Sequence, residues 1–231
     1  MAARPFAIHL DGEFGDWNGA PLLISDPEDA ALESPVDIGR VWATDDPAWM
    51  YLSVEVGRAV NVQAMAGELH LVLDVDGDPA TGGSRWGLAG ADIELVMSRQ
   101  DRPQPGGFGA GFGLRAVEGD TVGPLGSAYD LGVAALPTYA ADRFELRIAR
   151  AGGPGGLGRL GATARGTLVA VRDGRVVDQT DPWAHTFNSP SDPSPSEPPL
   201  APLADPPSGS FRVAAWNVSE GSFRSPAGHA R

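Results

Sequence analysis

Short stretches in which apolar and polar residues alternate recur along the chain, and turns rich in glycine, proline or aspartate separate them. Residues 143–149 alternate most regularly, with Phe144, Leu146 and Ile148 on one side and charged residues between them. Because successive side chains of a β-strand point to opposite faces, this pattern predicts half-buried strands. The expected strands are residues 6–10, 36–43, 49–56, 68–75, 92–97, 111–117, 143–149, 167–172 and 175–179.

Turn signals point to the same fold class. Asp173-Gly174 separates the last two expected strands and is typical of a two-residue hairpin loop. No segment shows helical periodicity over three turns, and the best helical candidate is a single turn near residues 60–66. The glycine-rich residues 100–110 and 152–161 are expected to be loops. The chain is therefore predicted to be all-β, an antiparallel, jelly-roll-like β-sandwich.

The composition changes sharply towards the C-terminus. Residues 189–209 are rich in proline and serine, which favour an extended spacer of polyproline type over a packed core. The apolar segment 211–218 that follows reads as an isolated strand, and a lone strand cannot build a core. We therefore expect a β-sandwich domain of binding type at 1–188, a linker at 189–209, and the opening fragment of a second, incomplete domain at 210–231.

Charge and cysteine content exclude several classes of protein. The formal net charge is −13, so the N-terminal domain is expected to repel nucleic-acid phosphates and anionic membranes. The chain has no cysteine, which excludes disulfides, thiolate nucleophiles and Cys-ligated zinc. No apolar run approaches the roughly 20 residues that span a bilayer, and the N-terminus does not read as a secretory signal. We expect a cytoplasmic protein if Met1 is the native start, and a secreted or periplasmic one if the start lies upstream.

An acidic run at residues 74–78, D-V-D-G-D, stands at the end of an expected strand. Repulsion among its three carboxylates is costly unless water or a cation screens it, and calcium takes about six to eight oxygen ligands. The run is not an EF-hand loop, because Pro79 and Arg85 stand where Gly and Glu are required. The alternative is a solvated turn whose carboxylates cap loop amides. The candidate calcium ligands are Asp74, Asp76, Asp78 and, from the neighbouring strand, Asp92.

Aromatic residues outside the strand patterns are the candidates for ligand contact. Indole faces stack on pyranose rings, so an exposed tryptophan in a loop suits a carbohydrate. Trp86, between glycine-flanked residues near the acidic run, is the first candidate, and Trp183, after Asp181-Pro182, is the second. Packing inside the domain is the alternative role for each of them.

The sequence does not support a complete catalytic site. The four histidines show no close spacing, which leaves a zinc site or a Ser-His-Asp triad without support. A pair of carboxylates for glycoside cleavage stays open, since acidic residues are numerous, but nothing marks such a pair. This chain alone is therefore not expected to be an enzyme.

Four segments resemble carbohydrate-binding modules of family 9 and their DOMON-like relatives. Residues 8–17, I-H-L-D-G-E-F-G-D-W, are similar to the opening of that family, and residues 41–53 look like its second strand pair. Residues 71–94 resemble its D-x-D-x-D-P-x-T-G and G-A-D-Y stretch, and residues 143–148 resemble a late strand. The resemblance implies a β-sandwich with bound calcium and, in some members, sugar binding.

Residues 211–218, F-R-V-A-A-W-N-V, look like the first strand of the endonuclease/exonuclease/phosphatase superfamily. By this resemblance Asn217 would lie at the phosphate and magnesium site, and the parent protein would be a metal-dependent phosphodiesterase or nuclease. The Glu, Asp and His residues that such catalysis needs have no room in this chain, so magnesium is expected only with a complete second domain.

The expected function is therefore that of a calcium-stabilised accessory module with carbohydrate as its candidate ligand, attached to the N-terminus of a phosphoesterase-family protein. Its partners would be carbohydrate and the missing C-terminal domain. A fragment of a metal-dependent hydrolase and a structural, protein-interaction sandwich are the alternatives.

Overall fold

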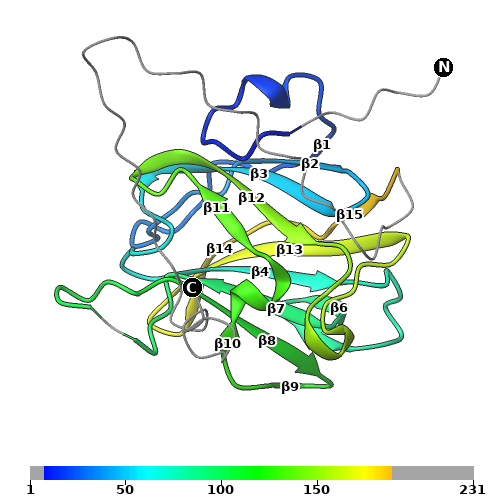
Figure 1. Cartoon of the computed structure of the whole chain (residues 1–231). Coiled ribbons are helices and arrows are strands. Elements are labelled where there is room, and N and C mark those ends of the chain that lie inside the picture. The colour runs from blue at the N-terminus through cyan, green and yellow to red at the C-terminus, as the bar shows by residue number, and fades with distance from the viewer. Residues whose placement is uncertain (1–7, 103, 189–231) are drawn as a thin grey trace, which may run out of the picture. The chain divides into compact units, whose positions relative to one another are not determined.

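Two antiparallel β-sheets face each other in the computed structural model, which describes residues 8–102 and 104–188 (Figure 1). In this part of the chain the helices are three short 3-10 turns, Gly15–Trp17, Ala128–Leu131 and Pro154–Gly156. The prediction of an all-β antiparallel sandwich is therefore confirmed. None of the helices described is long and apolar enough to cross a bilayer. The predicted linker at 189–209 and the fragment at 210–231, with Asn217, lie outside the described residues.

The first sheet has five strands in the order β1-β2-β3-β12-β11, and every neighbouring pair is antiparallel. These strands are β1 (Leu22–Ser25), β2 (Arg40–Asp45), β3 (Trp49–Val60), β12 (Ala141–Ala149) and β11 (Ala134–Leu136). Its longest ladder joins β3 to β12.

The second sheet follows the order β10-β8-β7-β4-β13-β14, with β9 paired to β8 and β15 paired to β13. Its strands are β4 (Glu68–Asp74), β7 (Ile93–Met97), β8 (Phe112–Glu118), β9 (Thr121–Val122), β10 (Gly126–Ser127), β13 (Thr163–Arg172), β14 (Arg175–Gln179) and β15 (Trp183–Thr186). A separate hairpin pairs β5 (Gly83–Arg85) with β6 (Leu88–Ala91). The expected Asp173-Gly174 turn joins β13 to β14.

The main hydrophobic core lies between the two sheets. Alternate residues of β12, Phe144, Leu146 and Ile148, are at most 2 % exposed, as the alternation predicted. Leu71 of β4 and Leu95 of β7 pack into the same core from the second sheet. Because side chains alternate along each strand, the polar neighbours of these residues lie on the outer faces of the sandwich.

Two predicted strands differ from the structure. Residues 8–10 form no strand, because the backbone N–H of His9 donates to Oδ2 of Asp16 in the loop that follows. The strand expected at 36–43 begins only at Arg40. The N–H of Ile38 donates to the side-chain carboxylate of Asp178, so it does not form a backbone hydrogen bond of a strand ladder.

The helical turn expected at residues 60–66 is also wrong. In its place Asn61 forms a tight turn, in which its side-chain oxygen accepts from Gln63 N at 3.0 Å and its carbonyl accepts from Ala64 N at 2.8 Å. An asparagine that bonds the backbone two residues on offers the chain a local alternative to a helix.

Candidate cation site and the adjoining hairpin

Three of the four predicted calcium ligands meet at the end of β4. One carboxylate oxygen from each of Asp74, Asp76 and Asp92 lies within 4.8 Å of the others. The sheet register explains this meeting, because Leu73 of β4 pairs with Ile93 of β7 and Asp92 N donates to Leu73 O at 2.9 Å. The strand end therefore delivers Asp74 beside Asp92.

The three carboxylates are oriented by nearby donors, and Oδ1 of Asp76 accepts from Asp78 N at 2.9 Å. Oδ1 of Asp74 accepts from Gly77 N at 2.7 Å, and Oδ2 accepts from Arg165 Nη1 at 3.2 Å. Oδ2 of Asp92 accepts from Val75 N at 2.8 Å. A carboxylate has about four lone-pair sites, so each group keeps acceptor capacity for a cation.

Asp78 does not join this group. Its Oδ1 accepts from Ala80 N at 2.9 Å, and its carbonyl accepts from the N–H and hydroxyl of Thr81. A side chain that bonds the backbone two residues on is an Asx turn, which turns the Asp78 carboxylate to its own loop. Of the predicted ligands, Asp78 is the one that the structure places apart.

The electrostatics of the cluster favour a positive charge within it. Burial raises the pKa of Asp74 above its ordinary value, although the N–H of Gly77 opposes the shift. Burial also raises the pKa of Asp92, and the charges of Asp76 and Asp74 add to it. The pKa of Asp76 is lowered, chiefly by the N–H of Asp78. A cation stabilises the charged forms of buried Asp74 and half-buried Asp92 beside the ionised Asp76.

The two ends of the β5–β6 hairpin pack directly against these carboxylates. A Cβ on Gly82 would lie 2.8 Å from Oδ1 of Asp92, and a Cβ on Gly90 would lie 2.8 Å from Oδ2 of Asp74. Both glycines have positive φ, +60° and +84° respectively. The start and the end of the hairpin therefore both lie beside the acidic cluster.

Trp86 occupies the tip of this hairpin. The loop between β5 and β6 consists of Trp86 and Gly87, with φ of 48° and 78°. Two successive positive φ values are typical of a type I′ hairpin turn. A bulky residue with positive φ is unusual, and such strain is often kept at functional positions.

The indole of Trp86 is half-buried and held from several sides. Its Nε1 donates to Oε1 of Glu94 at 2.8 Å, and the Arg85 guanidinium lies 4.2 Å from the ring centroid. The ring of His70 meets it edge-on at 5.8 Å. Since Arg85 covers one ring face, a ligand would meet the guanidinium together with the exposed part of the indole.

Glu94 organises the outer face of the second sheet around Trp86. Its side chain is fully buried, and its oxygens accept from Arg85 Nε at 3.0 Å and from Arg115 Nε at 2.6 Å. Nδ1 of His70 lies 2.6 Å from Oε1 of the same group. Sequence reasoning missed this network, although a glutamate inside the apolar run I-E-L-V-M was a signal for it.

Trp183 is not the exposed aromatic residue that we expected. It is 5 % exposed and belongs to the main core. A Cβ on Gly166 would lie 2.5 Å from its ring, so the indole fills the space that this glycine leaves on β13. Strand β15, paired with β13, orients Trp183 towards the core. The sequence did not predict this strand, because it is only four residues long and follows Pro182.

A pocket of about 440 Å³ opens beside Asp92. Gly82, Gly119 and Leu157 are among its lining residues. This opening gives the acidic cluster access to solvent, and with it to ions.

Comparison with known proteins gives one structural neighbour. No family model and no curated protein matches the chain. A solved structure described as a "putative carbohydrate-binding protein" from Bacteroides uniformis aligns with a TM-score of 0.39 and 11 % sequence identity, over 76 % of this chain and 84 % of that chain. At that level of similarity the neighbour assigns no ligand to this chain.

Proposed function

We propose that this domain is a non-catalytic binding module in which calcium, held by Asp74, Asp76 and Asp92, fixes a hairpin that presents Trp86 and Arg85 to a carbohydrate. The observation that carries the proposal is the contact of both hairpin ends with the carboxylates, at Gly82 and Gly90.

Calcium is the cation that suits the cluster best. The three aspartates offer carboxylate oxygens, which hard cations prefer over the nitrogen and sulfur ligands typical of zinc. Three carboxylates supply between three and six oxygens, and water completes a calcium shell of about six to eight. The sole basic group within 4.0 Å of these carboxylates in the described part of the chain is Arg165, so their negative charge is only partly balanced.

The cation would act on the ligand site through the hairpin. Without it, repulsion between Asp74, Asp76 and Asp92 pushes apart the strand ends that Gly82 and Gly90 touch. With the cation bound, its positive charge holds together the two ends of the segment from residue 74 to residue 92. We therefore expect calcium to order the hairpin tip that carries Trp86. In the calcium-free protein this tip should be less ordered and should bind the ligand more weakly.

The exposed chemistry at the tip suits a neutral sugar. Trp86 supplies an aromatic surface, and the Arg85 and Arg115 side chains remain 23 % and 18 % exposed while Glu94 fixes their direction. Guanidinium groups donate several hydrogen bonds in a fixed geometry, which hydroxyl oxygens can accept. The net charge of −13 disfavours polyanionic sugars.

A glycan array followed by calorimetry on the full chain tests this function. Neutral glycans should bind in calcium and should bind at least tenfold more weakly, about 1.4 kcal/mol, after chelation or in Trp86→Ala. Tyr139→Ala, which removes an aromatic residue 64 % exposed elsewhere on the surface, is the control and should bind normally. An array without any glycan binding in the presence of calcium contradicts the carbohydrate part of the proposal.

A further inference from the structure

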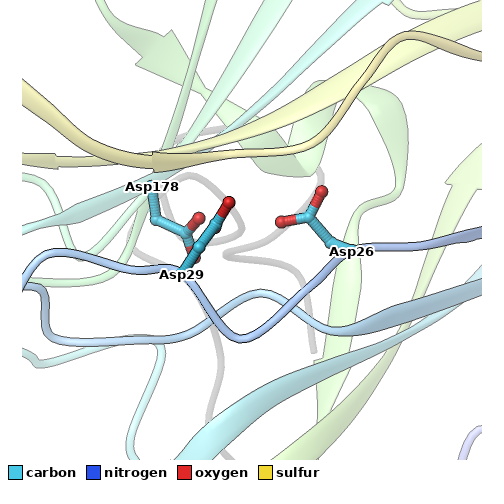
Figure 2. Close-up of side chains that lie close together, drawn as sticks. All are labelled: Asp26, Asp29 and Asp178. Atoms are coloured by element: carbon cyan, nitrogen blue, oxygen red, sulfur yellow. The ribbon is translucent and has the colours of Figure 1, made fainter.

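A second group of carboxylates lies where the β1–β2 connection meets β14. Asp26 follows β1, Asp29 lies three residues further in the same connection, and Asp178 belongs to β14. One oxygen from each lies within 4.8 Å of the others. Figure 2 shows the three side chains pointing into the space between them.

Two oxygens in this group lack the partner that buried polar atoms normally have. Asp178 is 6 % exposed, and its Oδ2 accepts from Ile38 N at 2.6 Å. Its Oδ1 is buried and has no hydrogen-bond partner among the described residues, and the same holds for Oδ2 of Asp26. Leaving a buried acceptor unpaired costs about 1–3 kcal/mol, and more for a charged group.

The group also lacks the positive charge that the buried carboxylates of Glu94 and Asp74 have beside them. Glu94 lies beside two arginines and Asp74 beside one, whereas no basic group lies within 4.0 Å of Asp26, Asp29 or Asp178 in the part of the chain described.

Neighbouring acids add to the negative charge of this group. Burial raises the pKa of Asp26 to about 6, and the charge of Asp178 is the next cause. Burial likewise raises the pKa of Asp178. Asp37 and Asp181 are further acidic neighbours of Asp26. Every charged neighbour that shifts the pKa of Asp26 is negative. A carboxylate without a compensating positive charge is therefore costly here.

We propose that Asp26, Asp29 and Asp178 bind a second hard divalent cation, of the calcium class, which ties the β1–β2 connection to β14. The unpaired oxygens of Asp178 and Asp26 are its buried ligands, and Asp29 closes the site from the exposed side. The connection already touches β14 through Ala31 N, which donates to Val177 O at 2.9 Å. Because β1 belongs to one sheet and β14 to the other, the cation joins the two layers of the sandwich.

A proton shared between Asp26 and Asp178 is the competing explanation for the close approach. It would relieve the same repulsion without any ion. The two explanations differ in what is bound, so a direct count of cations per chain separates them.

The test counts bound calcium by equilibrium dialysis at pH 7.5 in the Asp76→Asn background, where the first cluster is disabled. We expect one calcium per chain in this background, and its loss in Asp76→Asn with Asp29→Asn and in Asp76→Asn with Asp178→Asn. Asparagine keeps an oxygen that can accept from Ile38 N, so the fold should persist. Asp29 is exposed, so its variant decides the question if the Asp178 variant fails to fold.

Asp76→Asn with Glu28→Gln is the matched control, because Glu28 is an exposed acid in the same connection outside the group. It should retain the calcium. The proposal is overturned if the Asp76→Asn chain binds no calcium, or if the ion persists when Asp29 is replaced. Either result is independent of the cluster at Asp74, which the background removes from the count.

Discussion

Nδ1 of His70 lies 2.6 Å from Oε1 of Glu94, and both side chains are almost completely buried on the outer face of the second sheet. On its other side, Nε2 of His70 lies 3.2 Å from Oε2 of Glu68. Burial alone would lower the pKa of His70, but the hydrogen bonds to Glu68 and Glu94 outweigh it and raise this pKa above 6.5. The two acids therefore favour the protonated, cationic form of this histidine.

The raised pKa of His70 makes the stability of the protein depend on pH. The contribution is fully present below the unfolded value of about 6.5 and is lost as the pH rises through the higher folded value. Thermal unfolding of the wild type and of His70→Gln should therefore converge as the pH is raised from 6 towards 9. A difference that stays constant over this range would contradict a charged His70.

Glu94 is predicted to be one of the most sensitive positions in the domain. Burial would raise its pKa, but hydrogen bonds from His70, Arg115 and Arg85 hold it well below the ordinary range. Glu94→Gln removes the negative charge, replaces one acceptor oxygen with a donor, and leaves the two arginines and His70 with a single neutral acceptor. We expect a loss of about 3–5 kcal/mol in the free energy of unfolding, measured in urea. Arg40→Gln, in an exposed ion pair with Glu55, should lower the free energy of unfolding far less than Glu94→Gln.

The opening motif of the chain is anchored by one carboxylate of the first sheet. Glu145 is fully buried and accepts from the N–H groups of Asp11 and Gly12, each at 2.6 Å, and from Trp17 Nε1 at 3.0 Å. Glu145→Gln turns one of its acceptors into a donor, which leaves at least one of these N–H groups unpaired. Stability should fall by about 1–3 kcal/mol.

Hydrogen exchange locates that loss. Amides of residues 8–20 should exchange faster in Glu145→Gln, while those of β4 and β7 on the other sheet should be unchanged. Uniform loss of protection over the whole domain would argue against a local anchor. The Asp11-Gly12 and Trp17 positions that carry the family resemblance thus have a structural role in this chain.

The contact between Gly82 and Asp92 can be tested with a matched glycine. Gly82 and Gly119 have nearly the same φ, +60° and +59°, but a Cβ on Gly119 would meet nothing within 4 Å. Gly119→Ala should cost about 1–2 kcal/mol from its backbone alone. Gly82→Ala should cost about 1–3 kcal/mol more, because its Cβ also meets the carbonyl oxygens of Ala91 and Gly90 and Oδ1 of Asp92, and it should weaken calcium binding. Equal costs and equal calcium affinity would show that the hairpin end does not sense the cluster.

Local patterns predicted the parts of the fold that depend on single strands. Alternation at 143–149 placed Phe144 and Ile148 in the core because the period of a strand is also the period of its burial. The acidic run and Asp92 were predicted to meet because they end neighbouring strands. The structure places the Asp78 carboxylate apart from the other three, since it accepts from Ala80 N in its own loop.

Contacts between distant segments could not be predicted in this way. Asp26 follows β1 of the first sheet, Asp178 lies in β14 of the second, and no spacing in the sequence relates them. No spacing in the sequence relates Glu145 of β12 to Trp17 of the first 3-10 turn either. Trp183 reads as a loop residue, and only its pairing to β13 through Gly166 buries it.

Hydrogen exchange of the β5–β6 hairpin, with and without calcium, tests the central claim most directly. In the wild-type chain, calcium should slow exchange of the amides between Gly83 and Ala91 at least tenfold. In Asp76→Asn, where asparagine can still accept from Asp78 N and Thr81, calcium should leave the same amides unchanged. Hairpin exchange that is equal with and without calcium in the wild type would contradict a cation site at Asp74, Asp76 and Asp92 that controls Trp86.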